Sequence, residues 1–233
     1  MSDPDGLDPT LVLVRLLQLA SPALPIGAYS YSQGLEWMVA AGGVRDAIAA
    51  QAWIGDALEL VFAPGEAAVA WRLLDVVQQA DWPRMHEWND WFRASRETAE
   101  LRAETEQMGG SLCKLASDLE LLDAPARAAA TAMAPITLPA AYALTVRGFA
   151  VPAEPALTAY VWSWLEYQTL AAMKTIPLGQ SAGQRLLTRV GSRIPAAVAL
   201  ARSIVDEDIC TFAPGLALAS SRHETQYTRL FRS

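Results

Sequence analysis

Alanine fills 43 of the 233 positions, and it is spread through segments whose apolar residues recur with the period of an α-helix. Alanine has the highest intrinsic helix propensity of the amino acids. No stretch alternates apolar and polar residues over the length of a strand, and no Asn-Gly or Asp-Gly pair stands between two strand-like runs. The sequence therefore predicts an all-α fold, a single domain of about ten helices with a flexible polar C-terminal tail.

Proline, glycine and aspartate mark where the helices start and stop. Starts are expected at Asp8-Pro9, Asp81-Trp82-Pro83 and Asp123-Ala124-Pro125, where an acceptor precedes a proline in the first turn. The Gly109-Gly110 pair marks either a kink or a close helix crossing. The predicted helices cover residues 10–20 (apolar nearly all round, so buried on every side), 30–41, 44–62 (stopped by Pro64-Gly65), 66–80, 93–122 (one helix or two), 139–148, 154–176, and one on each side of Gly191.

Residues 154–176 carry the clearest helical period in the chain. Their apolar residues fall at i, i+3, i+4, i+7 and i+8 spacing, and one glutamine lies in the same stripe. This pattern predicts a long helix that buries one face, formed by Leu157, Tyr160, Val161, Trp164, Leu165, Gln168, Ala171 and Ala172.

The charge pattern constrains the partners. The formal net charge is −7, which argues against a nucleic-acid binder. Residues 1–123 hold 19 acidic and 8 basic side chains, whereas residues 124–233 hold 6 and 10. This asymmetry fits a protein whose faces meet different partners, although it also fits ordinary solvated helix faces.

The sequence favours a cytoplasmic protein with reduced cysteines. Residues 1–9 are acidic and lack the pattern of a signal peptide. The uncharged run 128–146 is interrupted by Pro135 and Pro139, so it is interpreted as two buried helices around a break rather than a membrane span. Cys113 and Cys210 lie far apart and form no C-x-x-C motif.

The usual catalytic and metal-binding patterns are missing, so no catalytic residue, metal site or cofactor is predicted. His86 and Asp90 lack a third ligand nearby, and Cys113 is interpreted as a small buried apolar residue. No phosphate-binding glycine motif occurs. Four glutamates are interpreted as ion-paired with neighbouring arginines on a solvated helix, namely Glu97, Glu100, Glu104 and Glu106 with Arg93, Arg96 and Arg102.

Residues 21–36 form the first segment that ordinary packing does not explain. Two prolines and a glycine define an irregular loop, and Ser30 or Ser32 could cap the following helix with Gln33 and Glu36 in a capping box. The crowding of tyrosines, serines and an acid predicts a buried polar network or a contact surface. We call this segment the motif loop; its candidate residues are Pro25, Gly27, Tyr29, Ser30, Gln33, Gly34 and Glu36.

Two further segments carry unexplained polar or cationic groups. Lys174 ends the longest predicted helix, and Gln180, Gln184 and Arg185 follow on one edge of the next. The polar tail, residues 220–233, ends with apolar Tyr227, Leu230 and Phe231 on one face, flanked by Arg229 and Arg232. Such a segment is typical of a docking peptide that becomes ordered on a partner, unless Phe231 folds back onto its own core.

Together these segments resemble the urease accessory protein F family, and the resemblance covers most of the chain. The motifs that carry it are Leu-Leu-Gln-Leu-Ala-Ser-Pro (16–22), Pro-Ile-Gly-Ala-Tyr-Ser-Tyr-Ser-Gln-Gly-Leu-Glu (25–36), Pro-Leu-Gly-Gln-Ser-Ala-Gly-Gln (177–184) and Arg-Leu-Phe-Arg-Ser (229–233). Each motif alone would be weak, but their order and spacing are specific.

The resemblance implies a homodimeric, non-enzymatic chaperone of urease maturation. Members bridge the accessory protein called D or H and the nickel-carrying GTPase called G, and they help to deliver nickel to apo-urease. The tail residues Tyr227, Arg229, Leu230, Phe231 and Arg232 would dock on the D/H partner. Lys174, Gln180, Gln184 and Arg185 would take part in control of the GTPase. Residues 1–219 would form the helical domain.

Two other classes of function remain open from the residues alone. One is a helical enzyme whose acidic residues meet only in three dimensions. The other is a regulator that binds a small apolar ligand, as eight tryptophans could indicate.

Overall fold

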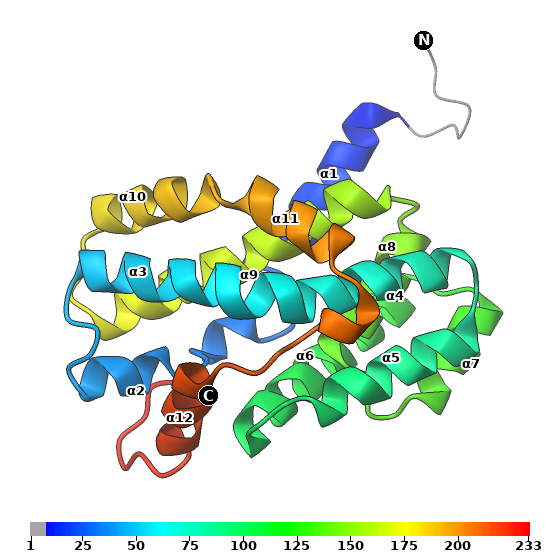
Figure 1. The fold of residues 1–233 in the computed structure, drawn as a ribbon. Coiled ribbons are helices and arrows are strands. Elements are labelled where there is room, and N and C mark those ends of the chain that lie inside the picture. The colour runs from blue at the N-terminus through cyan, green and yellow to red at the C-terminus, as the bar shows by residue number, and fades with distance from the viewer. Residues whose placement is uncertain (1–7) are drawn as a thin grey trace.

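The computed structural model describes residues 8–233, and helices account for all of the regular structure in that range (Figure 1). No strand occurs among these residues, so the predicted all-α fold is confirmed. The α-helices are α1 (Pro9–Ala20), α2 (Leu35–Ala40), α3 (Ala47–Ala57), α4 (Ala68–Gln78), α5 (Trp82–Ala94), α6 (Ala99–Asp118), α7 (Ala124–Ala132), α8 (Leu138–Gly148), α9 (Ala153–Thr175), α10 (Gln180–Gly191), α11 (Ile194–Ser203) and α12 (Pro214–His223).

Helix α9 runs through the middle of the molecule, and α1, α3, α4, α10 and α11 pack around it (Figure 1). Every residue of the stripe predicted for residues 154–176 is buried. On the other side of α4, helices α5, α6 and α8 form a second group of helices. The apolar residues of both groups belong to one continuous core.

The predicted helix starts at three aspartates are confirmed. Asp8, Asp81 and Asp123 are the N-caps of α1, α5 and α7, and a proline lies in the first turn of each helix. The aspartate side chains accept hydrogen bonds from backbone N–H groups at 2.8–3.1 Å. Local sequence is sufficient to set these boundaries because the cap uses only residues within one turn.

The predicted break at Pro64-Gly65 is wrong. Helices α3 and α4 are joined into one continuous rod by η2 (Leu58–Ala67), a π-helix that contains Pro64. Proline lacks a backbone donor and its ring clashes with the carbonyl one turn before in an α-helix; the wider π turn makes room for the ring. The Pro64 carbonyl accepts a hydrogen bond from the Cys210 N–H at 3.2 Å, so a distant segment also holds this turn in place.

Of the two interpretations left open for Gly109-Gly110, the structure favours a close crossing. Helix α6 continues through both glycines. A Cβ atom added at Gly109 would lie 2.3 Å from the Ile136 carbonyl oxygen, whereas one at Gly110 would meet nothing within 4 Å. Gly109 therefore lets α6 approach the start of α8.

Helix α1 corrects another expectation, that residues 10–20 are buried on every side. It packs on α9 along one face, and only Leu19 is buried. The opposite face is exposed and apolar; it consists of Leu11, Leu13, Val14 and Leu17. An all-round apolar pattern predicts burial, but in a single chain nothing covers this face among the described residues.

The uncharged run 128–146 is divided between α7 and α8, as predicted, with the break at residues 133–137. The expectation that both helices are buried is correct for α8 but wrong for α7, in which only Ala126 and Ala130 are buried. Within residues 8–233, no helix combines the length and apolarity that a membrane crossing requires. The expectation that the chain begins without a signal peptide rests largely on residues 1–7, which lie outside the described residues.

Candidate functional site

The motif loop, Lys174 and the C-terminal segment meet at one surface. Lys174, near the end of α9, places its Nζ 3.4 Å from the Tyr29 carbonyl oxygen. The same Nζ lies 5.5 Å from the ring centroids of both Tyr29 and Phe231. Segments that are far apart in sequence therefore contact each other through one cation–π cluster.

The motif loop adopts a fixed irregular conformation. Gly27, Gln33 and Gly34 all have positive φ values, of 77°, 52° and 80°. Left-handed backbone cannot continue an α-helix, so α2 starts only at Leu35 and the helix predicted from residue 30 is shorter than expected. The capping box is only half formed: Ser32 Oγ accepts from the Glu36 N–H in the first turn of α2 at 3.3 Å, but the Glu36 carboxylate bonds to the C-terminal segment instead of closing the box.

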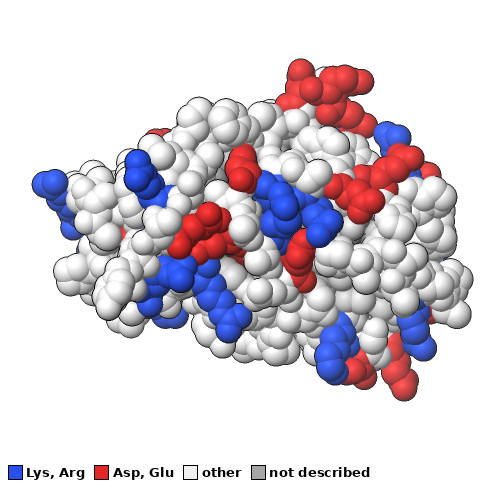
Figure 2. Space-filling view, turned by 90° about the horizontal axis from the view of Figure 1, so that it is seen from below, with Lys and Arg blue, Asp and Glu red and all other residues white. Residues whose placement is uncertain are grey.

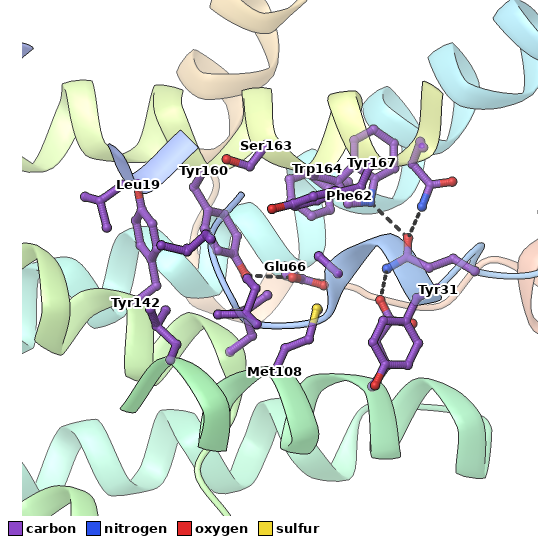
Figure 3. Close-up of a pocket in the computed structure, with 18 residues that line it drawn as sticks. Leu19, Tyr31, Phe62, Glu66, Met108, Tyr142, Tyr160, Ser163, Trp164 and Tyr167 are labelled. Atoms are coloured by element: carbon purple, nitrogen blue, oxygen red, sulfur yellow. Dashed lines mark hydrogen bonds between the residues drawn. The ribbon is translucent and has the colours of Figure 1, made fainter. Parts of the chain in front are cut away.

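Gln33 is the centre of a polar network that joins the motif loop to α6 and α9. Its Nε2 donates to Glu104 Oε1 at 2.8 Å, and its Oε1 accepts from Trp164 Nε1 at 2.9 Å and from Gln168 Nε2 at 3.2 Å (Figure 3). Tyr31 Oη donates to Gln107 at 2.8 Å. The buried polar network predicted for this segment is confirmed.

The C-terminal segment, residues 224–233 after α12, lies against the motif loop. The Arg232 N–H donates to the Ser30 carbonyl and the Ser32 N–H donates to the Ser233 carbonyl, both at 2.8 Å. The N–H groups of Leu230 and Phe231 donate to the Glu36 carboxylate. Backbone atoms thus fix the segment along its last four residues.

This arrangement corrects the expectation that the three apolar tail residues share one exposed face. The segment is not helical, and Phe231 is packed into the core with only 6% of its surface exposed. Leu230 is 70% exposed and Tyr227 is fully exposed. The structure shows the alternative conformation, in which Phe231 folds back onto its own core. The tail was predicted to begin at residue 220, but α12 continues to His223, so the non-helical segment begins at residue 224.

The interpretation of Glu97, Glu100, Glu104 and Glu106 as a solvated, ion-paired helix face is only partly correct. Glu97 is exposed, but the first half of α6 lies against α12 and the C-terminal segment. Glu104 and Arg96 are buried. Glu100 pairs with His223 and Arg229, and Arg93 pairs with Glu106 across two helices. In Figure 2, which shows the side on which α12 lies, acidic and basic groups alternate in small clusters. Sequence spacing placed these glutamates on one helix but gave no signal for the distant groups that contact them.

Behind this surface lies a small cavity that contains two buried carboxyl groups. Glu66 Oε1 accepts from the Tyr160 hydroxyl at 2.7 Å, and its other oxygen lies 3.7 Å from Arg96 Nη1 (Figure 3). Burial raises the pKa of Glu66, and Arg96 opposes this increase. Burial also raises the pKa of Glu104 to about 7, although hydrogen bonds from Ser233 and Gln33 partly offset it. The cavity measures about 50 Å³, enough for a few water molecules.

Glu104 should make the unfolding free energy depend on pH. The folded protein holds the Glu104 proton up to about pH 7, whereas the unfolded chain releases it near pH 4.5. The folded state therefore binds more protons in this window, and stability falls as the pH rises through it. We expect Glu104→Gln to remove a loss on the order of 2–3 kcal/mol between pH 5 and pH 8. Urea unfolding of both proteins across this range measures it; parallel curves would contradict the prediction.

The remaining candidates lie elsewhere. Gln180, Gln184 and Arg185 are exposed on the first two turns of α10, and no side-chain hydrogen bond described in the structure joins them to the motif loop or the C-terminal segment. Lys174 alone of that group contacts the site.

Two kinds of catalytic group are relevant to the described residues, a metal-ligand set and a reactive thiol. No set of three or more His, Cys, Asp or Glu side chains within residues 8–233 is placed to hold a metal ion. Cys113 is half-buried against the core, and burial raises the pKa of its thiol, which disfavours the nucleophilic thiolate. The site is instead an ordered surface composed of backbone, aromatic and charged groups, which suits recognition of another protein.

Comparison with known proteins gives consistent matches. The family model described as UreF matches residues 44–191. The urease accessory protein UreF of Azoarcus sp. (strain BH72) is 52% identical, and the match covers 96% of each chain. That of Janthinobacterium sp. (strain Marseille) is 48% identical over 95% of this chain and 98% of its own. A bifunctional urease accessory protein UreEF of Bordetella bronchiseptica is 50% identical over 95% of this chain, which spans 52% of that longer protein.

Proposed function

This chain belongs to the UreF family of urease accessory proteins, and from this membership we propose that it is a maturation chaperone that bridges two other accessory proteins. One is the protein called D or H, and the other is the nickel-carrying GTPase called G; the assembly assists nickel delivery to apo-urease. The observation that best supports this role is the convergence of the motif loop, Lys174 and the C-terminal segment on one surface. The bifunctional UreEF relative supports a role within an assembly of accessory proteins.

We propose that the D/H partner binds the C-terminal segment within residues 220–233, and that residues 8–219 provide the helical scaffold. Tyr227 and Leu230 are large apolar side chains that project from an ordered backbone. Arg229 and Arg232 lie beside them and can orient a partner through hydrogen bonds to carboxylates or carbonyls. Phe231 contributes by anchoring the segment to the core.

The GTPase is proposed to contact Lys174 and the exposed edge formed by Gln180, Gln184 and Arg185. We expect Lys174→Ala and Gln180→Ala to leave the melting temperature unchanged within about 2 °C, since exposed polar side chains contribute little to stability. Both should reduce urease activation in cells that express the urease and accessory genes, or alter GTP hydrolysis in the assembled complex. Ser203→Ala, an exposed polar change at the end of α11, is the control. Normal activation by both variants would assign this segment a purely structural role.

A homodimer is proposed through the exposed face of α1. Leu13, Val14 and Leu17 are more than half exposed, and Leu17 borders an open apolar groove that continues to Trp162 on α9. Exposed apolar patches of this kind mark interaction surfaces. We expect Leu17→Glu to convert a dimer into a monomer in sedimentation velocity. Leu60→Glu, at a similarly exposed leucine on η2, should leave the dimer intact. A protein that is monomeric before the change, or dimeric after it, would contradict this proposal.

The two other classes of function have less support. A pocket for a drug-sized apolar ligand usually measures about 300 Å³ or more and buries most of the ligand's surface. The buried cavity beside Trp164 is only about 50 Å³, and the larger groove beside Trp162, of about 840 Å³, is widely open to solvent. The two carboxyl groups there, Glu66 and Glu104, are buried and are already engaged in hydrogen bonds with Tyr160, Gln33 and Ser233. A non-catalytic role is therefore the better proposal.

Co-purification tests the bridging role directly. The full chain is co-expressed with the D/H protein and the GTPase, and a tag on either partner is used for capture. We expect the chain to bind the D/H protein alone and to be required for the GTPase to join it. Joining of the two partners in the absence of this chain would overturn the proposed bridge.

A further inference from the structure

Arg96, in the turn between α5 and α6, is a buried cation with too few partners. Only 7% of its surface is exposed. Its Nη1 lies 3.7 Å from Glu66 Oε2, which is too far for a hydrogen bond, and its Cζ lies 5.1 Å from the centroid of the Phe92 ring. Its Nε is buried and has no hydrogen-bond partner within residues 8–233. A buried donor without a partner is costly, so this atom requires an acceptor.

Arg96 lines a second cavity, which lies between α3, η2, α9 and the start of α12. Gln33, Glu66 and Gln168 supply most of the other polar groups on its wall. The cavity measures about 20 Å³. A cavity needs roughly 10–15 Å³ to hold one water molecule, so this one has room for a single water and excludes an organic ligand.

The two opposite charges on the cavity wall select a neutral guest. The Glu66 carboxylate would repel an anion, and the Arg96 guanidinium would repel a cation. The guest must accept a hydrogen bond from Arg96 Nε. It can also donate, because Glu66 Oε2 faces Arg96, and because Gln168 uses its amide N–H on Gln33 at 3.2 Å and keeps its carbonyl oxygen available. Water has this combination of donors and acceptors.

We infer that this cavity is a binding site for one internal water molecule, which accepts from Arg96 Nε and donates to Glu66 Oε2 and Gln168 Oε1. Internal waters typically make about three hydrogen bonds, which is the number of partners here. The water completes an ion pair that is too wide to bond directly, since a bridging water is nearly as favourable as a direct hydrogen bond. It joins the α5–α6 turn, η2 and α9, and extends the network of Gln33 to Arg96.

A crystal structure of the full chain, at a resolution that shows ordered water, tests the site directly. We expect one water peak at about 2.7–3.2 Å from Arg96 Nε. A crystal soaked in bromide should show no anomalous peak there, because the Glu66 carboxylate excludes anions. Empty density beside Arg96, or a bromide peak in the cavity, would overturn the inference.

The direction of a stability change gives a second test. Ala57, the last residue of α3, lines the cavity. Ala57→Val would stabilise the protein by filling an empty cavity, but it would destabilise it by displacing a bound water and leaving Arg96 Nε unpaired. Ala52→Val, at an exposed position on the same helix, controls for the lower helix propensity of valine. We expect the melting temperature of Ala57→Val to lie about 3–8 °C below that of Ala52→Val. An equal or higher value would contradict the bound water.

Ala57→Thr separates loss of the water from simple overpacking. Threonine has nearly the shape of valine, but its hydroxyl can take over hydrogen bonds that the water makes. Its melting temperature should therefore exceed that of Ala57→Val. Equal melting temperatures would assign the loss to overpacking and count against the site. If these variants do not fold, the crystal structure of the unaltered chain still decides the question.

Discussion

Gly109→Ala is expected to lower the free energy of unfolding by about 3 kcal/mol, the upper part of the usual range for overpacking a close contact. The added Cβ would lie 2.3 Å from the Ile136 carbonyl oxygen, 2.5 Å from the Thr137 carbonyl carbon and 2.8 Å from the Leu138 nitrogen. All three atoms belong to the backbone at the start of α8, so no side chain can rotate away. Helices α6 and α8 would have to separate, which would loosen the packing between them.

Gly110→Ala is the matched control on the same helix. Its Cβ would meet no atom within 4 Å, so the higher helix propensity of alanine should raise stability by up to about 1 kcal/mol. Chemical denaturation monitored by circular dichroism measures both changes. In thermal unfolding, Gly109→Ala should lower the melting temperature by about 6–12 °C for a chain of this size. Equal stabilities of the two variants would show that this crossing is not a close contact.

Much of the fold follows from local sequence because helix caps and helical periods act within a few residues. The caps at Asp81 and Asp123 and the buried stripe of α9 were predictable for this reason. Pro64 was not, since the π-helix that accommodates it also depends on contact with Cys210. The exposure of α1 was not predictable either, because an apolar helix looks the same whether its own chain or another molecule covers it.

The candidate site was predictable only in part. The tyrosines, serines and acid of the motif loop indicated a polar network, and Gln33 and Glu36 are its central members. The partners of those residues come from α6, α9, α12 and the C-terminal segment, all more than 60 residues away, and sequence spacing carries no information on such contacts. Glu104 therefore looked like a solvated charge, and His223 gave no signal at all. The same limit explains Phe231, whose burial depends on Glu36 and Lys174.

Removal of residues 227–233 is expected to abolish binding to the D/H protein while the helical core remains folded. Tyr227 and Leu230 are exposed and apolar, and burial of a side chain such as leucine contributes about 1.5–3 kcal/mol. Two anchors of this size can dominate an interface of modest area. Pull-down with tagged D/H protein measures the loss of binding, and far-UV circular dichroism measures the helix content. Retained binding would contradict the proposed docking.

Single substitutions distinguish docking from packing within this segment, because Leu230 and Phe231 point in opposite directions. Leu230→Ala should weaken D/H binding by about tenfold, equivalent to about 1.4 kcal/mol, with no change in melting temperature. Phe231→Ala should lower the melting temperature and weaken binding together, since it removes the anchor beside Lys174. Its cost is limited to the free energy that attaches the segment, because the segment can detach without opening the rest of the core. Leu60→Ala, at an equally exposed leucine on η2, should change neither quantity. A large loss of melting temperature in Leu230→Ala with binding retained would mean that the segment serves only the core.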